Sequence, residues 1–225
     1  MKLSAETINV LKNFAKINPN FKTEKGNTIR TKDQGNTQFA IATIAETLPC
    51  DFAIYDLTKF LTVVDGLFKD PDLEFKEHEV IISSQDKEDG IQHFWYCEPG
   101  IIDDVQVLRK FPEPDAEFTL SEKLFNRMNR CVGVLSGTMK EIRFIGGNGV
   151  VKLVGYDKSK SDKNTFEIIL HDYDGADFDV SVAHKRLEMI PGTYHCSVIN
   201  GRILSAENTE YPIKYAVALT VDEAS

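Results

Sequence analysis

No apolar stretch in this 225-residue sequence approaches the ~20 consecutive residues that a membrane-spanning helix requires. The first ten residues, MKLSAETINV, also lack the apolar core of a secretory signal peptide. Cysteine is scarce, and Cys50, Cys97, Cys131 and Cys196 stand singly, without the C-x-x-C pairs that zinc and redox sites use. We therefore expect a cytoplasmic protein with reduced thiols and no membrane partner.

Motifs for catalysis and cofactor binding are missing as well. The sequence has no H-E-x-x-H and no G-x-S-x-G. The glycines of GGNG at 146–149 are not followed by the Lys-Ser/Thr of a phosphate-binding loop, so a hairpin turn is favoured there. These absences favour a protein that is not an enzyme and that uses neither a cofactor nor a metal.

One acidic segment, HDYDGADFD at 171–179, carries enough carboxylates to suggest a divalent metal. A calcium-binding EF-hand loop needs glycine at its sixth position and glutamate at its twelfth. Counting from Asp172, the glycine comes fourth and the twelfth residue is Ala183, so a tight turn into a strand is preferred. A metal-dependent hydrolase that uses this segment stays open as an alternative.

The sequence has fewer positive than negative side chains: 26 Lys and Arg against 35 Asp and Glu, which gives a formal net charge of −9. Such a balance argues against a nucleic-acid partner. The stretch SEKLFNRMNR at 121–130 is nevertheless cationic. A helix would place Lys123, Arg127 and Arg130 on one stripe and its apolar residues on another face. This stretch therefore predicts a helix with one core face and one cationic face.

Most of the chain consists of short β-rich runs separated by turn signals, which is typical of antiparallel hairpins. Only four stretches have the apolar spacing of short helices: residues 5–16, 56–66, 121–135 and 182–190. Together these patterns predict an α+β fold with antiparallel sheets.

The segment EPGIIDDVQVLRKFPEPD, at about 98–115, contains three prolines and divides the chain into halves of similar length. We interpret this segment as a connector between a first domain at 1–108 and a second at 116–225. The halves resemble each other, since LSAETINVLKNF at 3–14 aligns with LSEKLFNRMNRC at 120–131. CDFAIYDLTKFLTVV at 50–64 aligns in the same order with ADFDVSVAHKRLEMI at 176–190. A duplicated α+β unit is therefore predicted.

Each of the four predicted helices carries cations on its polar side, whereas acidic residues crowd the loops and strand ends. An isolated cationic stripe is more often a solvated face than a binding surface. Its repetition in all four helices favours one basic surface that holds DNA while the rest of the molecule repels it. The candidate DNA-facing residues are Lys12, Lys16, Lys59, Lys123, Arg127, Arg130, Lys185 and Arg186.

Several segments resemble the DNA polymerase sliding clamps of T-even-type bacteriophages. They are MKLSAETINVLKNFAKIN at the start, CDFAIYDLTKFL at 50–61, HFW at 93–95, HDYDGADF through MIPGTY at 171–194, and YAVAL near the end. The resemblance implies two similar clamp domains per chain and a closed homotrimeric ring of six domains, the architecture also found in proliferating cell nuclear antigen. In such a ring each domain contributes a helix pair to the inner surface, and antiparallel sheets form the outer wall.

The resemblance also implies a function and its partners. An ATP-dependent clamp loader would place the ring on duplex DNA, the ring would tether the replicative polymerase without reading sequence, and late-transcription factors would use it as well. Other clamps seat partner peptides in an apolar pocket at the domain junction, so we expect the pocket at the connector's apolar residues: Ile101, Ile102, Val105, Val107, Leu108 and Phe111. The alternatives are that these residues only pack the domain seam, or that the protein is a non-encircling interaction scaffold of the same fold.

Overall fold

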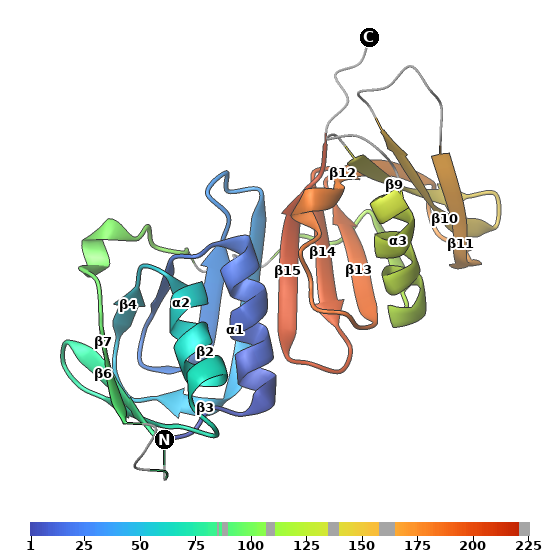
Figure 1. Cartoon of the computed structure of the whole chain (residues 1–225). Helices are drawn as coiled ribbons and strands as arrows, with labels where there is room; N and C mark the ends of the chain where they lie inside the picture. The colour runs from blue at the N-terminus through green and yellow to red at the C-terminus, as the bar shows by residue number, and fades with distance from the viewer. Residues whose placement is uncertain (85, 87–89, 107–110, 135–139, 158–164, 221–225) are drawn as a thin grey trace. The chain divides into compact units, whose positions relative to one another are not determined.

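The computed structural model describes residues 1–84, 86, 90–106, 111–134, 140–157 and 165–220 (Figure 1). The chain divides into two compact units, one formed by residues 1–36 and 40–107 and the other by residues 37–39 and 108–225. In the described part of the chain, no helix is long and apolar enough to cross a membrane.

The first unit combines a pair of packed helical segments with short antiparallel strands. Its elements are α1 (Ala5–Ile17), β1 (Phe21–Thr23), β2 (Gly26–Lys32), β3 (Gln38–Leu48), β4 (Phe52–Ile54), α2 (Leu57–Leu61), the π-helical turn η1 (Thr62–Leu67), β5 (Asp72–Phe75), β6 (Glu79–Ser83), β7 (Ile91–Trp95) and the 3-10 turn η3 (Pro99–Ile101). Strands β5, β6 and β7 form one antiparallel sheet with β7 at its end, and β1 pairs with β4.

The described part of the second unit contains two four-stranded antiparallel groups and one α-helix. Its elements are β8 (Ala116–Leu120), α3 (Glu122–Val134), β9 (Lys140–Gly147), β10 (Val150–Asp157), β11 (Thr165–Asp172), β12 (Phe178–Ala183), the 3-10 turn η4 (His184–Arg186), β13 (Tyr194–Ile199), β14 (Ile203–Asn208) and β15 (Ile213–Ala218). One group runs in the order β11-β10-β9-β12 and the other in the order β15-β14-β13-β8. Helix α3 packs on β10 and β11.

Burial follows the predicted patterns. In α1 the buried face includes Leu11 and Phe14, and in α3 it includes Phe125 and Met128. Strand β10 alternates strictly between half-buried and buried side chains, as a strand with one face on the core should. The α+β fold with antiparallel sheets is confirmed.

The prediction of a fourth helix at 182–190 was wrong. Strand β12 continues to Ala183, a single 3-10 turn follows at His184–Arg186, and Leu187 has left the helical conformation. The apolar residues of this stretch are buried from a strand and a turn: Val182, Leu187 and Met189. The predicted helix pair is therefore present in the first unit, whereas in the described part of the second unit α3 is accompanied by one 3-10 turn.

Candidate nucleic-acid and partner interfaces

Hydrogen bonds of Ser4 and Thr7 fix the start of helix α1. Ser4 is the N-cap residue, and its Oγ accepts a hydrogen bond from the Thr7 backbone N–H at 3.2 Å. The Glu46 carboxylate of β3 accepts from the Ser4 backbone N–H and, at 2.5 Å, from the Thr7 hydroxyl. Burial alone would raise the pKa of Glu46, but the hydrogen bonds from Thr7 and Ser4 outweigh it and lower that pKa. The helix start is thereby fixed to β3.

The helices of the first unit present their polar faces to solvent. Lys12 and Lys16 of α1 and Lys59 of α2 are exposed. Lys12 is not a free charge, because its Nζ lies 2.6 Å from the Asp65 carboxylate in η1. Lys59 lies in the first turn of α2, where its backbone N–H donates to the Asp56 side chain at 2.8 Å.

The cationic stripe of α3 is as the sequence predicts. Lys123, Arg127 and Arg130 are exposed, while Phe125 and Met128 are buried on the opposite side. Among the described residues, no acidic side chain forms an ion pair with any of these three cations. The stripe therefore presents three exposed cations, without an ion-pair partner among the described residues, on a single helix.

The last two predicted cations lie on η4 and differ from each other. Lys185 is exposed, whereas the half-buried Arg186 donates from Nη1 to the Ala218 carbonyl at 3.1 Å. His184 donates from Nε2 to the Asn129 side-chain oxygen of α3 at 2.9 Å, which ties η4 to that helix. Burial, together with the charge of Lys140, lowers the pKa of His184. The turn thus presents Lys185 to solvent and directs Arg186 toward a backbone carbonyl.

The connector residues have mixed burial. Ile101 is 59% exposed, Ile102 is buried, and Val105 and Phe111 are half-buried. Val107 and Leu108, also predicted for the partner pocket, lie outside the described residues. Ile101, Ile102 and Val105 line a hollow of about 200 Å³ in the first unit.

This hollow is more polar than the predicted apolar pocket, because cations of β1 and β2 also line it: Lys22, Arg30 and Lys32. Lys22 Nζ lies 2.5 Å from the Asp104 carboxylate, and Lys32 Nζ lies 4.0 Å from that of Asp103. These three cations are not among the residues predicted from the sequence. The sequence pattern that indicates them is the pair Arg30 and Lys32. These residues are two apart on one strand, so their side chains lie on the same face.

The acidic segment 171–179 contains no metal site in the described structure, where no group of three or more His, Cys, Asp or Glu could hold an ion. Asp172 ends β11, and Asp179, in β12, pairs with Arg143 at 2.5 Å from Nε to Oδ1. The Tyr173 ring packs edge-on against Phe178, with ring centroids 5.7 Å apart. This geometry is that of the predicted turn into a strand.

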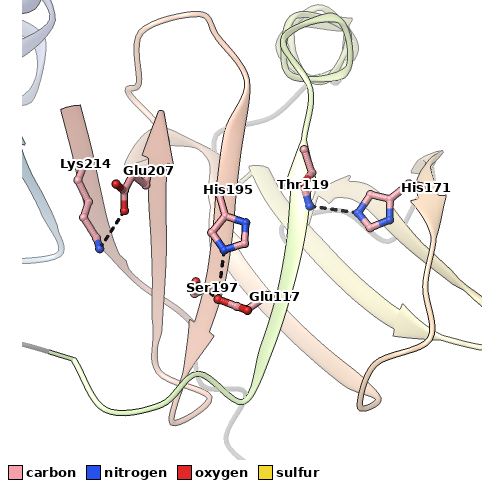
Figure 2. A network of polar contacts seen from close by, with 7 residues as sticks. All are labelled: Glu117, Thr119, His171, His195, Ser197, Glu207 and Lys214. Atoms are coloured by element: carbon pink, nitrogen blue, oxygen red, sulfur yellow. Dashed lines mark hydrogen bonds and ion pairs between the residues drawn. The ribbon is translucent and has the colours of Figure 1, made fainter. Parts of the chain in front are cut away.

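A further polar network lies on β8, β13, β14 and β15 of the second unit (Figure 2). The Glu117 carboxylate lies 3.1 Å from His195 Nε2 and accepts from the Ser197 hydroxyl at 3.2 Å. His171 Nε2, in β11, accepts a hydrogen bond from the Thr119 backbone N–H at 3.1 Å, and this contact links the two sheets of the second unit. These contacts are exposed, and they join either neighbouring strands or, through His171, the two sheets, so we assign them to structure.

The proteins similar to this chain include a processivity-factor family, a phage sliding clamp and two solved PCNA structures. The sequence model of the DNA polymerase processivity factor family matches residues 4–94. The sliding clamp of Vibrio phage KVP40 is 31% identical over 204 residues, covering 88% of this chain and 90% of that protein. Among solved structures, proliferating cellular nuclear antigen from Entamoeba histolytica matches with a TM-score of 0.69 at 15% identity, over 98% of each chain. The A. fulgidus PCNA, solved with the C-terminal region of FEN-1 bound, matches with a TM-score of 0.69 at 10% identity, over 96% of each chain.

Proposed function

This chain belongs to the sliding clamps, the DNA polymerase processivity factor family, and from that premise we propose that three copies close head to tail into a ring around duplex DNA. A processivity factor acts by tethering a polymerase rather than by catalysis. With clamp domains at 1–108 and 116–225, three chains supply six similar domains. Topological enclosure then provides a residence time on DNA that weak phosphate contacts alone do not provide.

The observation that carries the proposal is a pair of sheet-terminal strands with exposed apolar side chains. Strand β7 pairs with β6 at the end of its sheet, and two of its side chains, Ile91 and Trp95, are 65% and 67% exposed. Strand β11 pairs with β10 at the end of its sheet, and its Ile169 is 62% exposed. Exposed apolar strand edges favour pairing with another chain.

Because the two edges belong to different halves of the chain, pairing β7 of one copy with β11 of the next is a heterologous contact. Repeated heterologous contacts close into a ring when the rotation between copies fits. The duplication supports such closure, since the junction between chains can repeat the junction between domains.

The predicted cations supply the DNA contacts in this proposal. Lysine and arginine contacts to phosphate attract DNA without reading its sequence, and a protein that slides needs contacts that are weak and equivalent at every position. The exposed α3 stripe of Lys123, Arg127 and Arg130 supports this role most directly. The acidic remainder of the chain, with its net charge of −9, would repel DNA elsewhere.

The proposed partners follow from the family. We infer that an ATP-dependent clamp loader opens and places the ring, that the replicative polymerase binds through a peptide at the connector, and that late-transcription factors use the same ring in the host cytoplasm. The FEN-1 segment bound to the A. fulgidus PCNA supports peptide binding as the mode of attachment. The exposed Ile101 and the half-buried Val105 are available to such a peptide.

Molar mass and topology together test the proposal. Light scattering should give three times the mass of the chain, and loaded protein should stay on circular DNA but slide off the ends of linear DNA. A monomer that binds both forms equally would instead indicate the non-encircling scaffold and would refute the ring.

A further inference from the structure

Three cations meet in one hollow of the first unit, although the protein as a whole is acidic. Lys22 projects from β1, and Arg30 and Lys32 project from one face of β2. The Lys22 and Lys32 side chains are only 30% and 17% exposed. We call these three residues, with the space of about 200 Å³ that they line, the cationic hollow.

Three acids lie at the cationic hollow: Asp33 and Asp103 line it, and Asp104 forms an ion pair with Lys22. The two connector acids are much more exposed than the lysines they contact. Asp103 and Asp104 of the connector have side chains that are 91% and 81% exposed. The hydrogen bond and charge of Lys22, with the charge of Lys32, lower the pKa of Asp104, so this carboxylate stays ionised. Ion pairs with an exposed partner contribute little to stability. The two aspartates can therefore leave the hollow at small cost.

Arg30 has hydrogen-bonding capacity that the described residues do not satisfy. Its Nε is buried and has no hydrogen-bond partner among the described residues. Buried donors without partners are unfavourable, and a carboxylate is well suited to the guanidinium group because it accepts two parallel hydrogen bonds. Arg30 lines the hollow, so its guanidinium group adds a third cation to the two lysines that an incoming carboxylate would meet there.

We propose that the cationic hollow binds a carboxylate side chain from an acidic segment of a partner protein, and that Asp103 and Asp104 occupy the hollow as an internal competitor until that segment arrives. Ile101, Ile102 and Val105 line the same space and would contact apolar neighbours of the incoming acid. This inference rests on the proposed role of the connector in partner binding. It adds two features to that role: the partner segment must carry an acidic residue, and Asp103 and Asp104 must leave the hollow before it binds.

A nucleic-acid phosphate is the competing ligand chemistry for three cations. The occupant already present is a pair of carboxylates, and the wall beside them is apolar. Both observations favour a peptide over a nucleic acid, which has no apolar side chain to place against Ile101 and Ile102.

The test uses the full chain and a capped synthetic peptide with the sequence of residues 100–106, GIIDDVQ, as the probe. Calorimetry should show binding that weakens as salt rises, because the contacts are ionic. The variant Asp103→Asn/Asp104→Asn should bind the peptide about three- to tenfold more tightly, since the internal competitor is gone. The variant Lys22→Gln/Lys32→Gln should bind it at least about tenfold more weakly.

Two controls make the result specific. A peptide with both aspartates changed to asparagine should not bind, and Lys69→Gln, which removes an exposed cation outside the hollow, should behave like the unsubstituted protein. Thermal melting confirms that each variant is folded. Equal binding of the acidic and amide peptides, or preferential binding of an eight-nucleotide single strand, would overturn the inference.

The same variants separate this inference from the proposed ring. All residues of the hollow belong to one unit of one chain, so peptide binding does not require a trimer. Peptide binding by a protein that fails to stay on circular DNA would refute the ring alone. A ring that stays on DNA but ignores the acidic peptide would refute the hollow alone.

Discussion

The Lys12 ammonium lies 2.6 Å from the Asp65 carboxylate and joins α1 to η1. Both side chains are nearly half exposed, at 48% and 43%, so the pair is screened by water and salt. The pair nevertheless places a negative charge beside one of the cations proposed to contact DNA. Lys12 is therefore not equivalent to the cations of the α3 stripe, which have no acidic ion-pair partner among the described residues.

Removing Asp65 should strengthen DNA binding. In Asp65→Asn the Lys12 charge becomes available, and we expect a gain of about two- to threefold in duplex affinity, measured by filter binding at low salt. Asp70→Asn is the matched control, because it frees Lys2, which is outside the DNA-facing set. An equal gain in both variants would mean that only net charge matters.

Charge reversal of the α3 stripe should weaken DNA binding by about tenfold or more. The variant Lys123→Glu/Arg127→Glu/Arg130→Glu should also show a shallower dependence of affinity on salt, since fewer phosphate counterions are released. Its stability should change little because all three side chains are exposed.

The control for this reversal is Lys2→Glu/Lys69→Glu/Lys76→Glu, which changes net charge equally at exposed positions outside the candidate set. Comparable losses of DNA binding in the two triple variants would count against the assignment to α3.

Polar substitution of the sheet-terminal strands should prevent ring closure. We expect Ile169→Asp in β11 and Trp95→Asp in β7 each to shift the light-scattering mass toward that of one chain. Each would bury an unpaired charge between copies. Tyr55→Asp is the control, because Tyr55 is 61% exposed but lies outside both strands. Trimers that persist in both edge variants would contradict the proposed pairing.

Glu46→Gln should loosen the start of α1 and lower the free energy of unfolding by about 1 kcal/mol at pH 7. The folded-state pKa of Glu46 lies below its ordinary value of 4.5, so its contribution is fully present above that pH. The contribution is lost as the pH falls through the lowered pKa. In urea titrations, the loss of free energy of unfolding in Glu46→Gln should therefore be larger at pH 7 than at pH 3.

A matched control for the Glu46 substitution is Glu210→Gln, at an exposed position. It should leave the free energy of unfolding unchanged at both pH values. A pH-independent loss in Glu46→Gln would show that hydrogen bonding to the ionised carboxylate is not the cause.

Two glycines should respond oppositely to alanine. A Cβ at Gly155 in β10 would meet the Phe166 ring of β11 at 2.1 Å, so Gly155→Ala should cost about 1–3 kcal/mol. A Cβ at Gly133 in α3 meets nothing within 4 Å, and Gly133→Ala should stabilise by about 0.5–1 kcal/mol. Melting temperatures that move in the same direction would contradict this packing.

The elements predicted best from sequence are those whose local signals agree. Helices α1 and α3 combine a serine at the start with apolar residues at helical spacing, and both appear within one or two residues of the predicted bounds. The stretch 182–190 also has apolar residues at helical spacing, but Val182 pairs with Ile142 in a sheet, and that long-range pairing overrides the local pattern.

The candidate site shows the same division between local and long-range information. The exposure of the α3 stripe follows from the spacing of Lys123, Arg127 and Arg130 along one helix. The ion pairs Lys12–Asp65 and Lys22–Asp104 do not follow from spacing, because their members are 53 and 82 residues apart. For the cationic hollow, spacing indicates only that Arg30 and Lys32 share one face of β2. Only the folded backbone brings such charges together.

Trp95 is the sequence's one tryptophan, and it lies on the strand edge proposed to join neighbouring copies. Indole emission shifts to shorter wavelength when the ring leaves water, so association of chains should shift the emission maximum of Trp95 to shorter wavelength. The molecule thus carries a label-free optical reporter of its assembly. Opening and closing on DNA could then be timed in a stopped-flow instrument without attaching a dye.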